Sequence, residues 1–102
     1  MFLYNMTVGI DKDVEQEWLQ WIVDEHFPKV MDTGMFVDYK IYKVLHDQEE
    51  GSVSYSVQYF AETIDHVTRY FEKYAPALLE EQRIRFRDKH IAFMTLLEQI
   101  PG

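Results

Sequence analysis

Large apolar residues alternate with small or polar ones over the first ten positions of the chain. A period of two is typical of a β-strand that buries one of its faces. The pattern predicts a strand over residues 2–10 with one strongly apolar face and one mixed face. The apolar face carries Phe2, Tyr4, Met6, Val8 and Ile10. The mixed face carries Leu3, Asn5, Thr7 and Gly9.

From Val14 the apolar positions recur at helical spacing. At about 100° per residue they fall on one broad arc. The arc consists of Val14, Trp18, Leu19, Trp21, Ile22, Val23, His26 and Val30. Pro28 has no N–H to donate to the preceding turn, and it disfavours helical geometry at Phe27. We therefore expect a helix with a kink or restart near residues 26–28 that ends at Gly34.

Two alternating runs follow over residues 35–45 and 53–61, and a charged loop over 46–51 joins them. This arrangement predicts a β-hairpin. The first run places Met35, Val37, Tyr39, Ile41 and Leu45 on one face, and Phe36, Asp38, Lys40, Tyr42 and Val44 on the other. The second run opposes Val53, Tyr55, Val57 and Tyr59 to Ser54, Ser56, Gln58 and Phe60.

A second helix is predicted from Thr63, a favourable N-cap residue, to about Phe86. Its apolar stripe consists of Ile64, Val67, Phe71, Tyr74, Ala75 and Leu78. Pro76 marks a kink or a restart, since proline is tolerated in the first turn of a helix. Residues 89–98 are rich in apolar side chains on both faces and predict a last strand.

The elements therefore follow the order βαββαβ within a single domain over residues 1–102. This order predicts an α+β, ferredoxin-like fold with a four-stranded antiparallel sheet. Right-handed crossovers place the first and third strands in the centre and both helices on one face.

Composition narrows the class of protein. Apolar residues make up 47% of the chain and cysteine is absent, so we expect a folded domain without disulfides or thiolate chemistry. We also expect a cytoplasmic protein, because the first residues resemble neither a signal peptide nor a membrane span. The net charge of −8 argues against nucleic acid as a partner.

Two helices cover only one face of such a sheet, and the other face is mixed. That face would carry Leu3, Asn5, Thr7, Asp38, Lys40, Tyr42, Ser54, Ser56, Gln58 and Phe60, with one face of the last strand. A hydrated antiparallel face is one interpretation. We favour the other, a homodimer in which two sheets pack together, because the apolar members would otherwise form a sizeable exposed patch.

Two polar residues of the first helix are candidates for chemistry. Glu25 projects near Trp18 and Trp21, where burial would raise its pKa and make it a proton donor. Its carboxylate could equally lie in water or pair with Lys29. His26 lies within the apolar arc, where it could act as a base or ligand, or donate to a carbonyl freed by the helix break.

The remaining motifs point away from a cofactor. His46, His66 and His90 show no spacing that would hold a metal, so we expect no metal site. We expect no cofactor either, because four glycines leave no phosphate-binding loop. Arg83, Arg85 and Arg87 form a basic run that neighbouring acids neutralise, with Glu81 and Arg85 as a helical pair.

The chain resembles a family of short bacterial proteins known only as a domain of unknown function. The resemblance rests on Tyr4-Asn5-Met6-Thr7, Trp18-Leu19-Gln20-Trp21, His26-Phe27-Pro28, Thr33-Gly34-Met35-Phe36, Tyr55-Ser56-Val57-Gln58-Tyr59 and Phe93-Met94-Thr95. It implies a fold similar to the dimeric α/β-barrel group. That group includes small monooxygenases, haem-degrading enzymes, chlorite-dismutase-like proteins and amino-acid-sensing domains, and it implies no particular catalytic residues.

These observations leave the activity open. The first hypothesis is a small-ligand binder or a cofactor-poor enzyme. Its candidate pocket residues are Asn5, Thr7, Glu25, His26, Ser56 and Gln58. The second is a non-catalytic dimeric module that regulates or scaffolds a partner, and a third is haem binding through His26. A cavity with convergent polar groups favours the first hypothesis, and a filled interior with an apolar outer patch favours the second.

Overall fold

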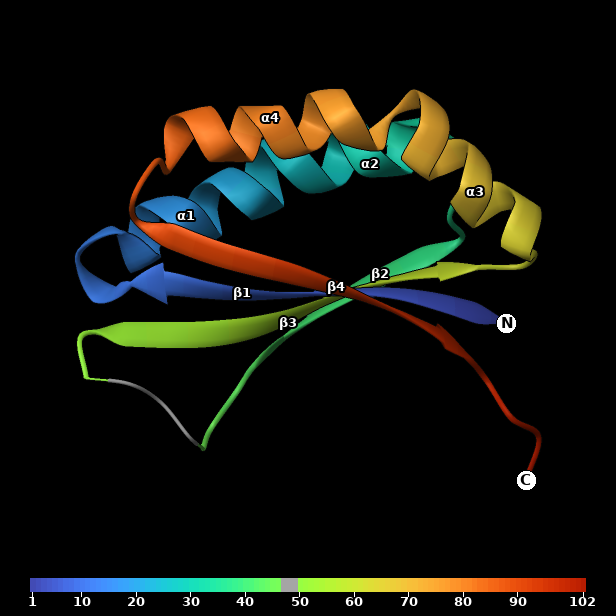
Figure 1. Cartoon of the computed structure of the whole chain (residues 1–102), viewed down its shortest axis with the longest axis horizontal. Helices are drawn as coiled ribbons and strands as arrows, with labels where there is room; N and C mark the ends of the chain where they lie inside the picture. Colours follow the sequence, from blue (N-terminus) through green and yellow to red (C-terminus); the bar gives the residue numbers. More distant parts are fainter. Residues whose placement is uncertain (47–49) are drawn as a thin grey trace.

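The computed structural model describes residues 1–46 and 50–102, which form one sheet covered by helices on one side (Figure 1). The elements are β1 (Phe2–Asp11), η1 (Lys12–Val14), α1 (Glu15–Trp21), η2 (Ile22–His26), α2 (Phe27–Asp32), β2 (Asp38–Lys43), β3 (Ser52–Ala61), α3 (Ile64–Lys73), α4 (Ala75–Arg85) and β4 (His90–Glu98). The strand order is β2-β3-β1-β4 and every pairing is antiparallel. The predicted α+β, ferredoxin-like topology with both helical segments on one face is confirmed.

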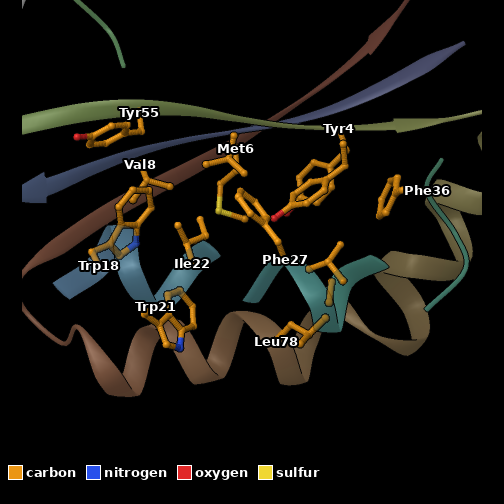
Figure 2. Packing of buried hydrophobic residues seen from close by; sticks show 14 of the residues in the cluster. Tyr4, Met6, Val8, Trp18, Trp21, Ile22, Phe27, Phe36, Tyr55 and Leu78 are labelled. Carbon is orange, nitrogen blue, oxygen red and sulfur yellow. The ribbon is translucent and has the colours of Figure 1, made fainter. Parts of the chain in front are cut away.

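The predicted alternation of β1 determines what the sheet buries. Tyr4, Met6, Val8 and Ile10 are buried beneath the helices, and the residues between them are half-buried on the opposite face. β3 repeats this pattern with its odd-numbered residues in the core. Figure 2 shows the resulting layer of side chains between sheet and helices. No helix in the described part of the chain is long and apolar enough to cross a membrane.

The first helical segment breaks where proline chemistry requires it. Residues Ile22–His26 form a π-helical turn, and α2 restarts at Phe27 with Pro28 in its first turn. Proline has no N–H to place in the helical ladder, and a widened turn is a common adjustment. Gly34 follows with a φ of 74°, a left-handed conformation that glycine adopts without strain. The predicted restart and stop are therefore confirmed.

The second helical segment divides at Tyr74 into α3 and α4, with Pro76 at the start of α4 as predicted. The Thr63 hydroxyl accepts a hydrogen bond from the His66 amide at 3.3 Å, which confirms the N-cap. The predicted stripe is wrong at Ile64, which is 42% exposed in the first turn. Tyr70 is buried instead, in contact with the rings of Tyr4 and Phe36, so the buried stripe begins one turn later.

The predicted strand over 35–45 was too long at both ends, since β2 covers only Asp38–Lys43. Strict alternation put Phe36 on the uncovered face, whereas its ring is buried in the core against Tyr4, Tyr59 and Tyr70. Phe36 lies before the strand, where alternation does not apply. Leu45 is exposed beyond its end. The loop predicted over 46–51 lies partly outside the described residues, at 47–49.

Candidate functional site

The face of the sheet opposite the helices is organised in rows that cross all four strands. From β2 to β4, one row contains Asp38, Phe60, Leu3 and Leu97; the next contains Lys40, Gln58, Asn5 and Thr95; the third contains Tyr42, Ser56, Thr7 and Phe93. The rows follow from the registers, because directly opposed residues in a sheet point to the same face. Four of the six predicted pocket residues therefore lie together on this face.

Those four residues form a continuous chain of hydrogen bonds. Gln58 Nε2 donates to Ser56 Oγ at 3.2 Å, and Ser56 Oγ donates to Asn5 Oδ1 at 2.6 Å. Asn5 Nδ2 then donates to Thr7 Oγ1 at 3.1 Å. These hydrogen bonds connect the two central strands, β1 and β3. We call these four residues the polar chain.

A hollow of 360 Å³ opens at the Thr7 end of the polar chain. Its lining comes from β1, β3, β4 and the turn before β4: Thr7, Gly9, Asp11, Ser52, Ser54, Asp88, Lys89, His90, Ile91 and Phe93. Gly9 makes this space, since its next row neighbours on the face are Ser54 and Ile91. The nearest atom to a Cβ built at Gly9 would be Ser54 Oγ, at 3.7 Å, which is an ordinary contact. The space that a side chain at this position would occupy is therefore open.

Charges at the far end of the hollow are largely paired. The Lys89 ammonium lies 3.2 Å from Asp13 Oδ2 and 3.6 Å from Asp11 Oδ2, and both carboxylates raise the pKa of Lys89. His90 Nδ1 donates to the carbonyl of Phe86 at 2.8 Å. Asp88 adds a further acid from a left-handed turn position, with a φ of 62°. The lining is therefore acidic at this end.

Apolar side chains surround the polar chain and the hollow. On β4, Ile91 is 77% exposed, Phe93 is 60% exposed and Leu97 is 44% exposed, and all three face away from the helices. The opposite edge strand β2 carries charges on the same face, at Asp38 and Lys40. Charged residues protect a sheet edge from association, and an apolar edge invites it. The uncovered face is thus apolar on the β4 side and polar in its centre.

The structure places Glu25 away from the polar chain. It lies in the helical layer with an exposed carboxylate, 3.8 Å from Arg85 Nη1 on α4. Lys29, the partner considered from the sequence, pairs instead with Glu81 at 3.0 Å. The predicted Glu81–Arg85 helical pair is therefore wrong, because both side chains reach across to the neighbouring helical segment. Glu25 has no buried, apolar surroundings that would make it a proton donor.

His26 is buried in the helical layer and is also separate from the polar chain. Its ring lies 4.9 Å from the Trp21 ring, and only 3% of the residue is exposed. Burial lowers the pKa of His26 to about 4, because the charged form would lose its hydration. Nδ1 is buried without a hydrogen-bond partner among the described residues.

These surroundings do not fit a metal or haem ligand at His26. An axial ligand must present a ring nitrogen to open space, whereas only 3% of His26 is exposed. Among residues 1–46 and 50–102, no three histidine, aspartate or glutamate side chains gather in a way that could hold a metal ion.

Sequence reasoning missed two polar contacts, one buried and one partly buried. Gln82 is buried on α4 and accepts a hydrogen bond from Trp18 Nε1 at 3.2 Å. The Tyr55 hydroxyl donates to the carboxylate of Glu15, which also lies 3.4 Å from Lys43 Nζ. Helical spacing would have placed Gln82 four residues after Leu78 on the buried stripe. The Glu15 contact joins two distant elements and leaves no local signal.

A family model and several solved structures resemble this chain. The model of a domain of unknown function, DUF4286, matches residues 1–100. HapK from Hahella chejuensis superposes with a TM-score of 0.74 at 12% identity, over 100% of this chain and 95% of HapK. A dimeric ferredoxin-like protein from an uncultured marine organism gives a TM-score of 0.67 at 11% identity, over 100% and 97%.

A third similar structure is SnoaB, a cofactor-independent oxygenase from Streptomyces nogalater. It superposes with a TM-score of 0.62 at 10% identity, over 99% of this chain and 95% of SnoaB. No curated protein matches the sequence significantly. At these identities the structural likeness demonstrates a shared fold and carries no function across.

Proposed function

The chain belongs to the DUF4286 family, and we propose that it is a homodimer that binds a small molecule on its uncovered sheet face. The observation that carries the proposal is the polar chain from Gln58 to Thr7, which ends at a 360 Å³ hollow. Binding pockets typically combine a mostly apolar lining with a few convergent polar groups. The hollow combines polar groups, among them Thr7 from the polar chain, with an apolar side made by Ile91 and Phe93.

Self-association is supported by the chemistry of the same face. Phe93, Ile91 and Leu97 leave a large apolar surface in water, and such patches usually mark an interface. A two-fold axis would pair the patch with its own copy. One similar structure is described as a dimeric ferredoxin-like protein, which is consistent with this arrangement. Pairing would also close the open side of the hollow.

Binding is favoured over catalysis by the nature of the polar chain. None of its four side chains titrates near neutral pH, so none can serve as a general acid or base. Hydroxyl and amide groups instead fix the orientation of a ligand. The alternative, a regulatory or scaffolding module that binds a protein partner, is supported by the exposed apolar face of β4.

The dimer is tested by placing a charge in the centre of the apolar surface. We expect Phe93→Asp to give a mass near 12.3 kDa by multi-angle light scattering, while the native protein gives twice that value at micromolar concentration. Ile84→Asp is the matched control, because Ile84 is 56% exposed on α4 and should leave the dimer intact. A native protein that is monomeric at this concentration would contradict the proposal.

Ligand binding is tested by filling the hollow without disturbing the strand. A Cβ atom at Gly9 would make only ordinary van der Waals contacts, and valine is favoured in strands. We therefore expect Gly9→Val to give a folded protein with an unchanged dimer. A crystallographic screen of small neutral aromatic fragments should show density in the hollow of the native protein and none in the variant. Fragments that occupy only other places would favour the protein-partner alternative.

A further inference from the structure

We infer that the hollow recognises a neutral, flat aromatic molecule through one oxygen acceptor, which takes a hydrogen bond from the Thr7 hydroxyl. The inference rests on the proposed function and adds the chemical class of the ligand. It follows from three features: the direction of the polar chain, the apolar side of the hollow and the charge of its lining.

The direction of the polar chain leaves one proton for a ligand. Asn5 Oδ1 accepts the hydrogen bond from Ser56, and Asn5 Nδ2, which can only donate, donates to Thr7 Oγ1. The Thr7 oxygen therefore already accepts a hydrogen bond. No acceptor among the described residues takes the Thr7 proton, and this side chain lines the hollow. The network thus presents a hydrogen-bond donor to whatever lies there.

One side of the hollow is apolar, and the rest of its lining is polar or charged. Gly9 supplies a floor without a side chain, and Ile91 and Phe93 supply an apolar wall along β4. The volume of 360 Å³ lies at the small end of the usual range for ligand pockets, about 300–1,000 Å³. A molecule of one or two fused rings could lie on the glycine with its edge toward Phe93, as aromatic rings prefer.

The charge of the lining disfavours an anionic acceptor. Lys89 is paired with Asp11 and Asp13, so its positive charge is already compensated. Asp88 adds negative charge at the same end, and the whole chain carries a net charge of −8. A carboxylate or phosphate would meet repulsion here, whereas a ketone or quinone oxygen would accept the Thr7 hydrogen bond without that cost.

Two isosteric probes isolate the hydrogen bond. 2-Acetylnaphthalene carries a carbonyl oxygen, and 2-isopropenylnaphthalene replaces that oxygen with a methylene group of similar shape. We expect the native protein to bind the ketone about 3- to 10-fold more tightly, the effect of one hydrogen bond. 2-Naphthoate should bind more weakly than the ketone at pH 7. Binding is measured by naphthalene fluorescence or titration calorimetry.

The matched variants are Thr7→Val and Thr7→Ser. Valine has the shape of threonine without the hydroxyl, so the preference for the ketone should fall to about 1-fold while both probes still bind. Serine keeps the hydroxyl and should keep the preference. Equal binding of the two probes to the native protein, or a preference that survives in Thr7→Val, would overturn the inference and leave the proposed function standing. Failure of both neutral probes to bind would count against both.

Discussion

Trp18 on α1 and Gln82 on α4 share a buried hydrogen bond that joins residues 64 positions apart in the chain. The indole Nε1 donates to Gln82 Oε1 at 3.2 Å, and the Gln82 amide lies 3.9 Å from the sulfur of Met6 on β1. One buried glutamine therefore contacts both helical segments and the central strand. A buried indole N–H needs a hydrogen-bond acceptor. In this fold the acceptor is a glutamine, a residue type that is usually exposed on the surface.

The Trp18–Gln82 contact makes Gln82 a residue of the core. We expect Gln82→Ala to lower the free energy of unfolding by about 2 kcal/mol, because the indole N–H loses its acceptor and a cavity forms. Urea unfolding followed by tryptophan fluorescence measures the change. Gln16→Ala, at an exposed position of α1, is the control and should change stability by less than about 0.5 kcal/mol. Equal effects of the two substitutions would refute this role.

Tyr55, Glu15 and Lys43 form a contact whose stability depends on pH. The Tyr55 hydroxyl, and after it Lys43, lower the pKa of Glu15 below its usual value of 4.5. A carboxyl with a lowered pKa stabilises the fold above its unfolded-state pKa, and this stability is lost as the pH falls through the folded-state value. We expect Tyr55→Phe to cost about 1.5 kcal/mol at pH 7 and less at pH 3.

Glu15→Gln provides the matched control for Tyr55→Phe. Glutamine keeps an oxygen acceptor for the Tyr55 hydroxyl and does not titrate. In that background the cost of Tyr55→Phe should be the same at pH 7 and pH 3 in urea unfolding experiments. A cost that shrinks equally in both backgrounds would show that the pH dependence comes from another group.

His26 should make the fold sensitive to mild acid. Its pKa falls from 6.5 to about 4 because of burial, with Glu81 opposing the shift and Lys29 adding to it. Between pH 6.5 and about 4, His26 is protonated in the unfolded chain and neutral in the folded chain. The free energy of unfolding therefore declines as the pH falls through this range and levels off below it. By pH 5 the loss reaches about 2 kcal/mol.

Substitution of His26 separates its titration from its packing. We expect His26→Leu to remove the decline between pH 7 and pH 5, because leucine fills the space beside Trp21 without a proton to bind. His26→Ala should lose about 2–4 kcal/mol at pH 7 through the cavity it leaves. His66→Leu keeps His26 and should retain the acid decline. Thermal unfolding at the two pH values measures all three, and a decline that persists in His26→Leu would rule out this residue as its source.

The periodicity of the sequence was sufficient for the topology and for four of the six predicted pocket residues. Strict alternation in β1 and β3 put Asn5, Thr7, Ser56 and Gln58 on one face, and their registers then brought them together. The same rule failed at Phe36, because the chain before β2 is not extended in register with the sheet.

The rest of the candidate site depends on tertiary packing. Glu25 and His26 lie next to each other in sequence, yet one is exposed beside Arg85 and the other is buried beside Trp21. Both residues lie in the π-helical turn, where Ile22 and His26 are the buried residues. The hollow at Gly9 could not be predicted from the sequence either. A glycine leaves a cavity only if its neighbours on the adjacent strands do not fill the space, and the sequence does not show which residues these neighbours are.

Asn5 should determine how two copies associate as well as how a ligand is held. Its row neighbours toward the β4 edge include Thr95, and the adjacent row contains Phe60, Leu3 and Leu97. A polar group within an apolar interface restricts association to arrangements that satisfy its hydrogen bonds. We expect Asn5→Leu to add an apolar side chain beside this row and to produce species larger than a dimer, seen by sedimentation velocity. Gln16→Leu adds the same apolar group on α1 and should sediment as the native protein does; a uniform dimer of Asn5→Leu would show that Asn5 has no part in specifying the interface.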